Sequence, residues 1–148
     1  MTIQKLLQSL VDHKVKFLVI GAWAFPTYKY SRSTYDIDIF YEPTKKNIKN
    51  IIHALKKAGY DGVDELTEKQ FKTKKMLFRQ YVQDTDIHPF VAGVEFKDVW
   101  KRKKETTIEK IKVFVPSLDH IIDMKKAAGR AKDIADLEVL EKIREKSR

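Results

Sequence analysis

Short apolar runs alternate with amphipathic segments along the chain, and this alternation restricts the fold more than any other feature. Lys16–Ile20, Asp36–Tyr41 and Ile111–Val115 have the length and the branched apolar side chains of β-strands. Residues 2–12, and the segment that Thr44 caps, instead carry apolar side chains at helical spacing. Strands that alternate with helices in this way predict an α/β layer within one domain.

The middle of the chain adds further elements. Ala22–Tyr28 predicts a brief helix, and residues 61–70 predict a loop. Lys74–Val82 and Asp86–Phe90 predict two strands that form an antiparallel pair. Val94–Arg102 predicts a short helix.

The C-terminal part predicts two helices. Pro116 and Ser117 open the first, which Gly129 closes. The second begins near Lys132, and its inward side is predicted to hold Ile134, Leu137, Leu140 and Ile143. The predicted fold class is therefore α/β (α+β), a small mixed sheet flanked by helices. We expect a single domain over residues 1–148, with the sheet core at about 15–115 and the helical pair at about 117–146.

Composition excludes several classes of function. The chain has 148 residues and no cysteine, which excludes disulfides, thiolate catalysis and cysteine zinc sites. No apolar run reaches the 18 or more residues of a membrane-spanning helix. The N-terminal residues also lack the features of a secretory signal, so we expect a cytoplasmic protein without a membrane partner.

The charge points toward anionic partners. Thirty Lys and Arg residues against 21 Asp and Glu residues give a formal net charge of +9. Such a surplus favours contact with nucleotides or nucleic acid, including RNA. A lysine-rich surface that keeps the protein soluble is an equally good interpretation of composition alone.

Two acidic residues alternate with isoleucines in the second predicted strand. Asp36 and Asp38 are two residues apart, so their side chains share one face at a separation of about 6.5–7 Å. Like charges this close repel each other unless a cation compensates them. Carboxylate oxygens on one face are suited to Mg²⁺ that also binds phosphates. The alternative is an edge strand with two ordinary surface aspartates.

The segment before this strand has features of a phosphate site. An apolar strand ends at Gly21, and a helix follows directly, so unpaired N–H groups face the turn. Arg32, Ser33 and Thr34 add a guanidinium and two hydroxyls. A plain tight turn and a surface arginine are the alternatives.

A third carboxylate follows in a later predicted strand. We favour Asp86 over Asp84 because Ile87 and Phe90 anchor that end of the strand in the core. Three converging carboxylates could hold two metal ions for an in-line phosphoryl displacement.

The order of these motifs resembles the minimal nucleotidyltransferases of the polymerase-β superfamily. The resemblance is closer to the branch of abortive-infection-type toxin and antibiotic nucleotidyltransferases, in which a strand–Gly-Gly/Ser–helix turn precedes an Arg-x-Thr-x-Asp-x-Asp strand. It extends over about residues 15–143. The matching motifs are Gly21-Ala22, Arg32-Ser-Thr34-Tyr-Asp36-Ile-Asp38, Asp86-Ile-His88 and the late segment Leu118–Leu137.

The resemblance implies a nucleotidyltransferase fold, an NTP donor and Mg²⁺ (or Mn²⁺) as cofactor. It implies that Asp36, Asp38 and Asp86 are the catalytic and metal-binding residues, with Asp86 helping to deprotonate the acceptor hydroxyl. The implied NTP-binding residues are Gly21, Ala22, Arg32, Ser33, Thr34, Lys125, Arg130 and Lys132. Asp133 would orient the last three cations, which could otherwise line a solvated helix face.

The resemblance implies the acceptor and the partner only as chemical classes. The resemblance implies transfer to an RNA end (tRNA included), a protein side chain or a small molecule, and a possible toxin–antitoxin partner protein. Ala22 stands where the family usually has Gly or Ser, which removes a hydroxyl from the turn. The alternative function is therefore a catalytically silent module that binds RNA or forms one half of a toxin–antitoxin pair. His88 shares a strand face with Asp86 and is predicted to lie in the core or at the rim, with contact to the site as the alternative.

Overall fold

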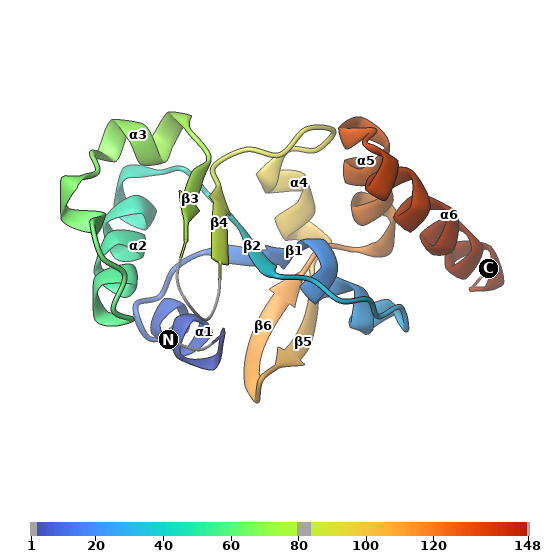
Figure 1. Cartoon of the computed structure of the whole chain (residues 1–148), viewed down its shortest axis with the longest axis horizontal. Coiled ribbons are helices and arrows are strands. Elements are labelled where there is room, and N and C mark those ends of the chain that lie inside the picture. The colour runs from blue at the N-terminus through green and yellow to red at the C-terminus, as the bar shows by residue number, and fades with distance from the viewer. Residues whose placement is uncertain (1–2, 80–83, 148) are drawn as a thin grey trace.

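A four-stranded mixed sheet forms the centre of the computed structural model, which describes residues 3–79 and 84–147 (Figure 1). The strand order is β1-β2-β4-β3. β1 pairs antiparallel with β2, β2 parallel with β4, and β4 antiparallel with β3. The strands are β1 (Phe17–Ile20), β2 (Asp36–Tyr41), β3 (Met76–Phe78) and β4 (Asp84–His88). The predicted small mixed sheet and the antiparallel β3–β4 pair are confirmed, although β4 begins two residues earlier than expected. Strand β3 begins two residues later than the predicted Lys74–Val82 and ends at Phe78, and residues 80–82 of that prediction lie outside the described residues.

The two faces of the sheet enter different apolar clusters. Val19, Ile37 and Ile39 join the large cluster that also contains residues of α1 (Ile3–Asp12) and α2 (Lys45–Lys57). Leu18 and Phe40, one position out of phase, join a second cluster. This alternation follows from the two-residue period of a strand. It leaves Asp36 and Asp38 on the face of the second cluster.

Helix α2 is capped as expected, because the side chain of Thr44 accepts a hydrogen bond from the Asn47 N–H at 3.3 Å. Residues 61–70 are not the predicted loop. They contain a 3₁₀ turn, Val63–Glu65, and the start of α3 (Glu68–Thr73). Thr67 and Gln70 form a capping box for α3, and this local hydrogen bonding begins a helix within a polar stretch.

Shorter elements lie around the sheet. A 3₁₀ helix, η1 (Gly21–Tyr28), takes the place of the predicted brief helix. Helix α4 (Phe96–Lys101) is shorter than predicted, and β5 (Lys104–Ile108) pairs with β6 (Ile111–Val115) as a separate hairpin. The hairpin projects below the sheet in Figure 1, and β6 lies against β1 and α1. The strand β5 was not predicted, because its first four residues are Lys, Glu, Thr and Thr, and only Ile108 is buried.

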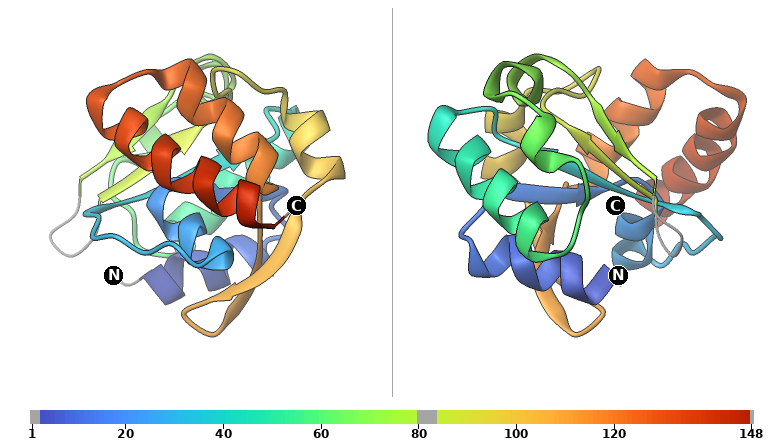
Figure 2. Two further views of the ribbon diagram at one scale, coloured as in Figure 1. Left: turned by 90° about the vertical axis from the view of Figure 1, so that its right-hand side faces the viewer. Right: turned by 60° about the vertical axis from the view of Figure 1, so that its left-hand side comes forward.

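The C-terminal helical pair is confirmed as α5 (Leu118–Ala128) and α6 (Ala131–Lys146), which pack side by side (Figure 2). The inward side of α6 differs from the prediction. Ile134 is 52% exposed, whereas Asp133 and Asp136 are buried together with Leu140. The helix is rotated in this way because Asp136 forms an ion pair with Arg32 and Asp133 forms one with Lys125. None of the described helices has the length and apolar character needed to cross a bilayer.

Candidate active site

The parallel pairing of β2 with β4 brings the predicted carboxylates to one wall of a cleft. Asp36 lies opposite Asp84, and Asp38 lies opposite Asp86. Asp36, Asp38 and Asp86 line a cleft of about 220 Å³. Asp84 is not part of its lining, and its Oδ2 lies 3.8 Å from Arg79 Nε. The structure therefore brings together the three acidic residues that the sequence selected, and their catalytic and metal-binding roles stay predictions.

Cationic side chains from the C-terminal pair line the same cleft. Lys125 comes from α5, Arg130 lies between the two helices, and Lys132 is in the first turn of α6. The pKa of Arg130 is raised mainly by its hydrogen bond with Asp133, and the negative charge of Asp38 raises it further. The cleft thus has an acidic wall from the sheet and a basic wall from the helices, which suits a metal-bound triphosphate.

The carboxylates influence one another electrostatically. The pKa of Asp36 is raised above its usual value, first by burial and then by the charge of Asp86. Asp38 and Asp84 raise it further, whereas Arg79 opposes the shift. Like charges in one place produce this pattern, and a bound cation would relieve it.

Three basic side chains hold two of these carboxylates. Arg79 Nη1 lies 2.7 Å from Asp86 Oδ1, and Lys75 Nζ lies 3.8 Å from Asp86 Oδ2. His88 Nε2 lies 2.9 Å from Asp38 Oδ1, so this histidine contacts the site rather than only the core. Among the described residues, no three His, Asp or Glu side chains form a ready-made metal site.

Lys75 and Arg79 were not predicted from the sequence. The alternation of residues 75–79 could have indicated them. Met76 and Phe78 are buried, so the side chains of Lys75, Leu77 and Arg79 face the other way. Leu77 is the register partner of Asp86, so Lys75 and Arg79 flank that partner on the same face.

The donor chemistry of the acidic wall fits a divalent cation. Carboxylate oxygens are the ligands that Mg²⁺ and Mn²⁺ favour, and Mg²⁺ commonly takes its remaining ligands from water and substrate phosphates. Asp36 has no ion pair within 4.0 Å in the described part of the chain, and it shares the cleft with Asp38 and Asp86. These three residues are the candidates to hold such an ion.

Gly21 is required where the chain passes beside Asp38. Its φ is +71°, and a Cβ placed on it would lie 2.7 Å from Asp38 Oδ2. Any side chain at this position would displace the carboxylate and strain the backbone. Gly21 lines the cleft, so the turn and the acidic wall are in direct contact.

Four predicted NTP-binding residues lie elsewhere. Ala22 is 8% exposed and packs in the core. Arg32 makes two hydrogen bonds to the carboxylate of Asp136, at 2.8 and 2.9 Å, which holds the loop before β2 against α6. Thr34 Oγ1 accepts from the Asp36 N–H at 3.3 Å. Neither these three nor Ser33 line the cleft, so their contact with NTP stays a prediction that the geometry does not favour.

Beneath the basic wall lies a buried ion network. Lys125 Nζ lies 3.0 Å from Asp133 Oδ1 and 3.2 Å from Asp136 Oδ2, and its side chain is only 12% exposed. Burial alone would raise the pKa of Asp133, but hydrogen bonds from Arg130 and Lys125 outweigh this effect and hold the pKa at about 2. Asp133 therefore orients two of the three predicted cations, as expected.

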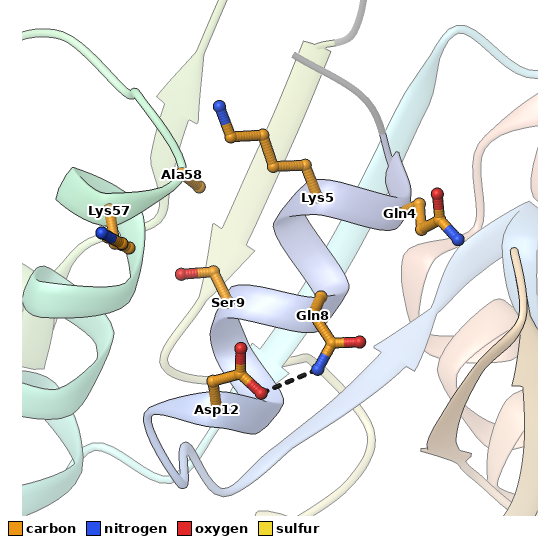
Figure 3. A pocket seen from close by; sticks show the side chains of 7 residues that line it. All are labelled: Gln4, Lys5, Gln8, Ser9, Asp12, Lys57 and Ala58. Carbon is orange, nitrogen blue, oxygen red and sulfur yellow. Dashed lines mark hydrogen bonds between the residues drawn. The ribbon is translucent and has the colours of Figure 1, made fainter.

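A larger groove, of about 360 Å³, lies between α1 and α2 (Figure 3). Its lining contains a single carboxylate, Asp12, which accepts a hydrogen bond from Gln8 at 2.7 Å. Ser9 donates to the Ala54 carbonyl at 2.6 Å. The described residues that line this groove bring no acidic groups together, so we assign the chemistry to the smaller cleft.

Comparisons with known proteins agree with this fold. The structure is similar to the lincosamide antibiotic adenylyltransferase LnuA in its lincomycin-bound form, with a TM-score of 0.64 and 20% identity over 97% of this chain and 98% of that one. It is also similar to a candidate nucleotidyltransferase from Thermotoga maritima, with a TM-score of 0.57 and 17% identity over 95% of this chain and 88% of that one. At these identities the likeness shows the fold.

No protein of curated function matches the chain. The family model described as "Nucleotidyltransferase of unknown function (DUF6036)" matches residues 1–145. The match covers nearly the whole sequence and includes every element of the cleft. The chain belongs to this nucleotidyltransferase family.

Proposed function

We propose that the protein transfers a nucleoside monophosphate from an NTP to an acceptor hydroxyl. The acceptor oxygen forms a bond to the α-phosphorus, the bond from that phosphorus to the bridging oxygen breaks, and pyrophosphate leaves. The hydroxyl proton passes to a carboxylate, for which Asp86 is the candidate. The observation that carries the proposal is the β2–β4 register, which sets Asp86 beside Asp38 at the cleft.

Asp36, Asp38 and Asp86 would hold Mg²⁺ or Mn²⁺. Bound divalent ions would offset the negative charge on the triphosphate and on the attacking and leaving oxygens. The chain's own part is to position these carboxylates. For Asp86 this requires that Arg79, whose side chain is 51% exposed, leaves the carboxylate when NTP binds.

The basic wall would bind the phosphates. Lys125 already pairs with Asp133 and Asp136, so it serves mainly to hold the wall in place. The Arg130 side chain is 61% exposed, and Lys132 lines the cleft from an exposed position. These two cations are therefore the better placed of the three to contact a triphosphate.

The acceptor is proposed as one of three classes: an RNA end such as that of tRNA, a protein side chain, or a small molecule. The net charge of +9 supports an RNA acceptor, and a partner protein of the toxin–antitoxin kind stays part of the proposal. The lincomycin-bound adenylyltransferase with a similar fold supports a small-molecule acceptor. A cytoplasmic location is proposed for each case.

Label transfer tests the proposal. The protein is incubated with each α-labelled NTP, Mg²⁺ and, separately, total RNA, protein extract and a set of hydroxylated small molecules. We expect label on one acceptor class with the wild type and with Asp61→Asn, an exposed carboxylate outside the cleft. Asp36→Asn and Asp38→Asn should lose the transfer. Transfer that survives both changes would show that the site is elsewhere.

A catalytically silent module is the second candidate. The ion pair of Arg79 with Asp86 favours it, because Arg79 occupies a carboxylate that catalysis needs. Ala22 also favours it, because this buried alanine offers no hydroxyl at the turn. It predicts salt-dependent RNA binding and no transfer with any NTP or metal. The same assay therefore separates the two functions.

A further inference from the structure

A second hollow adjoins the candidate active site. It has a volume of about 630 Å³ and lies between the loop that follows β4 and helix α5. Val91 lines both this hollow and the cleft, so the two meet at that residue. The loop reaches across to α5 in Figure 1. We call this hollow the acceptor groove.

The acceptor groove is acidic in a basic protein. Its charged lining consists of Glu95, Asp98 and Asp123, all exposed. Within the described residues, none of the three has an ion pair, whereas other carboxylates such as Glu42, Asp119 and Glu141 do. A chain with a net charge of +9 thus keeps three uncompensated carboxylates in one place. Such a place attracts a cation and repels a polyanion.

Apolar and hydrogen-bonding groups accompany the carboxylates. Phe90 is 63% exposed at the groove, and Val91 continues its apolar surface toward the cleft. His120 is only 9% exposed and also lines the groove. Its Nδ1 lies 3.2 Å from Ser117 Oγ, and its Nε2 has no hydrogen-bond partner in the described part of the chain. A ligand that enters the groove therefore meets an apolar surface, a free ring nitrogen and negative charge.

The loop that lines the groove packs closely against α5. Gly93 lies so near α5 that a Cβ on it would come within 2.7 Å of the Ala127 Cβ and 2.8 Å of the Asp123 carbonyl oxygen. This approach fixes the loop against the helix. Because the same helix supplies Lys125 to the cleft, the groove and the cleft keep a fixed relation to each other.

We propose that the acceptor groove binds the acceptor, and that this acceptor is a cationic small molecule with an apolar part and a hydroxyl group. The inference rests on the proposed nucleotidyl transfer, whose donor would occupy the neighbouring cleft. It selects one of the three acceptor classes. An RNA end would bring phosphates beside Glu95, Asp98 and Asp123, where like charges oppose binding.

A matched pair of probes tests the groove without nucleotide. 2-Amino-1-phenylethanol is cationic at pH 7, and 1-phenyl-1,2-ethanediol replaces its amine with a hydroxyl. In a ¹⁵N NMR titration we expect the amine to shift the amide signals of Val91, Val94 and Asp123 at concentrations where the diol does not. The combined variant Glu95→Gln, Asp98→Asn and Asp123→Asn should bind the amine about tenfold more weakly, since it removes three exposed negative charges that attract the ammonium group. The control Glu138→Gln, on the exposed side of α6, should bind like the wild type.

The results distinguish a failure of the groove assignment from a failure of the proposed nucleotidyl transfer. Equal binding of amine and diol, or a short single-stranded RNA that shifts the groove signals more than the amine does, would overturn the assignment of the groove. Selective binding of the amine that the triple variant loses would support it. A second arm adds α-labelled NTP and Mg²⁺ with total RNA and the amine as acceptors. Selective binding without transfer to any acceptor would contradict the proposed function and leave the groove a cation site.

Discussion

Asp38 and Asp86 lie opposite each other on the parallel strands β2 and β4, and both line one cleft. One strand alone could not place these two carboxylates opposite each other, because register partners belong to two different strands. The cleft therefore depends on the register between two strands that are distant in sequence.

Removal of the Asp86 charge should lower the pKa of Asp36. The charge of Asp86 is the largest of the neighbouring charges that raise this pKa, and it is second only to burial. In the metal-free protein, Asp86→Asn should move the carboxyl titration of Asp36, followed by ¹³C NMR, to lower pH. Asp61→Asn, outside the cleft, should leave it in place. An unchanged Asp36 titration in Asp86→Asn would mean that the two carboxylates do not converge.

Two glycine substitutions separate backbone strain from loss of the site. Gly21 and Gly62 have φ of +71° and +77°, but only at Gly21 would a Cβ meet Asp38, since nothing lies within 4 Å of one at Gly62. Each change to alanine should cost about 1–2 kcal/mol of unfolding free energy from the left-handed backbone alone. Gly21→Ala should cost more and should also abolish metal-dependent NTP binding, measured by calorimetry. Equal binding by the two variants would show that the position of Asp38 does not matter.

The carboxylate of Asp133 should make the free energy of unfolding depend on pH in the acidic range. Its pKa is about 2 in the folded chain, below the usual value of 3.8, so its contribution is complete above about pH 4 and is lost as the pH falls toward 2. A shift of this size corresponds to about 2 kcal/mol. Asp133→Asn should destabilise the protein by about 3–5 kcal/mol at pH 7, because Lys125 loses a buried partner.

Urea unfolding at several pH values checks this prediction. The difference between the wild type and Asp133→Asn should narrow as the pH falls from 5 to 2. Glu138→Gln on the exposed side of the same helix should stay within about 0.5 kcal/mol of the wild type at every pH. A difference that does not vary with pH would contradict the ionised, hydrogen-bonded state of Asp133.

Arg32 should act on stability and not on nucleotide affinity. Its guanidinium binds both carboxylate oxygens of Asp136, whose side chain is only 2% exposed. Arg32→Gln should therefore cost about 1–3 kcal/mol of unfolding free energy. Arg130→Gln, on the cleft side, should instead weaken NTP binding. If Arg32→Gln weakens NTP binding as much as Arg130→Gln at full stability, the role predicted from the sequence is restored.

The alternation of Asp36 and Asp38 with buried isoleucines was sufficient to predict β2 and the acidic face. The preference for Asp86 over Asp84 agrees with the lining of the cleft. Both predictions use a two-residue period, which is local to one strand. The helix ends at Thr44, Ser117 and Gly129 were predictable for the same reason, since capping is set by a few neighbouring residues.

Tertiary contacts determined what the sequence did not reveal. The apolar pattern placed Ile134 inward, but ion pairs to Asp133 and Asp136 turn α6 the other way. Likewise, the spacing of Arg32 near the acidic strand indicated NTP, although its partner Asp136 lies 104 residues later. The single-domain organisation and all proposed roles of the site residues stay predictions.

A crystal of the protein soaked with Mg²⁺ and a non-hydrolysable NTP would show directly whether the three carboxylates hold a metal-bound triphosphate. We predict metal density in contact with Asp36, Asp38 and Asp86. The triphosphate should lie toward Arg130 and Lys132, and Arg79 should have moved away from Asp86. A nucleotide bound in the groove between α1 and α2, or a triphosphate that avoids the three carboxylates, would contradict this prediction.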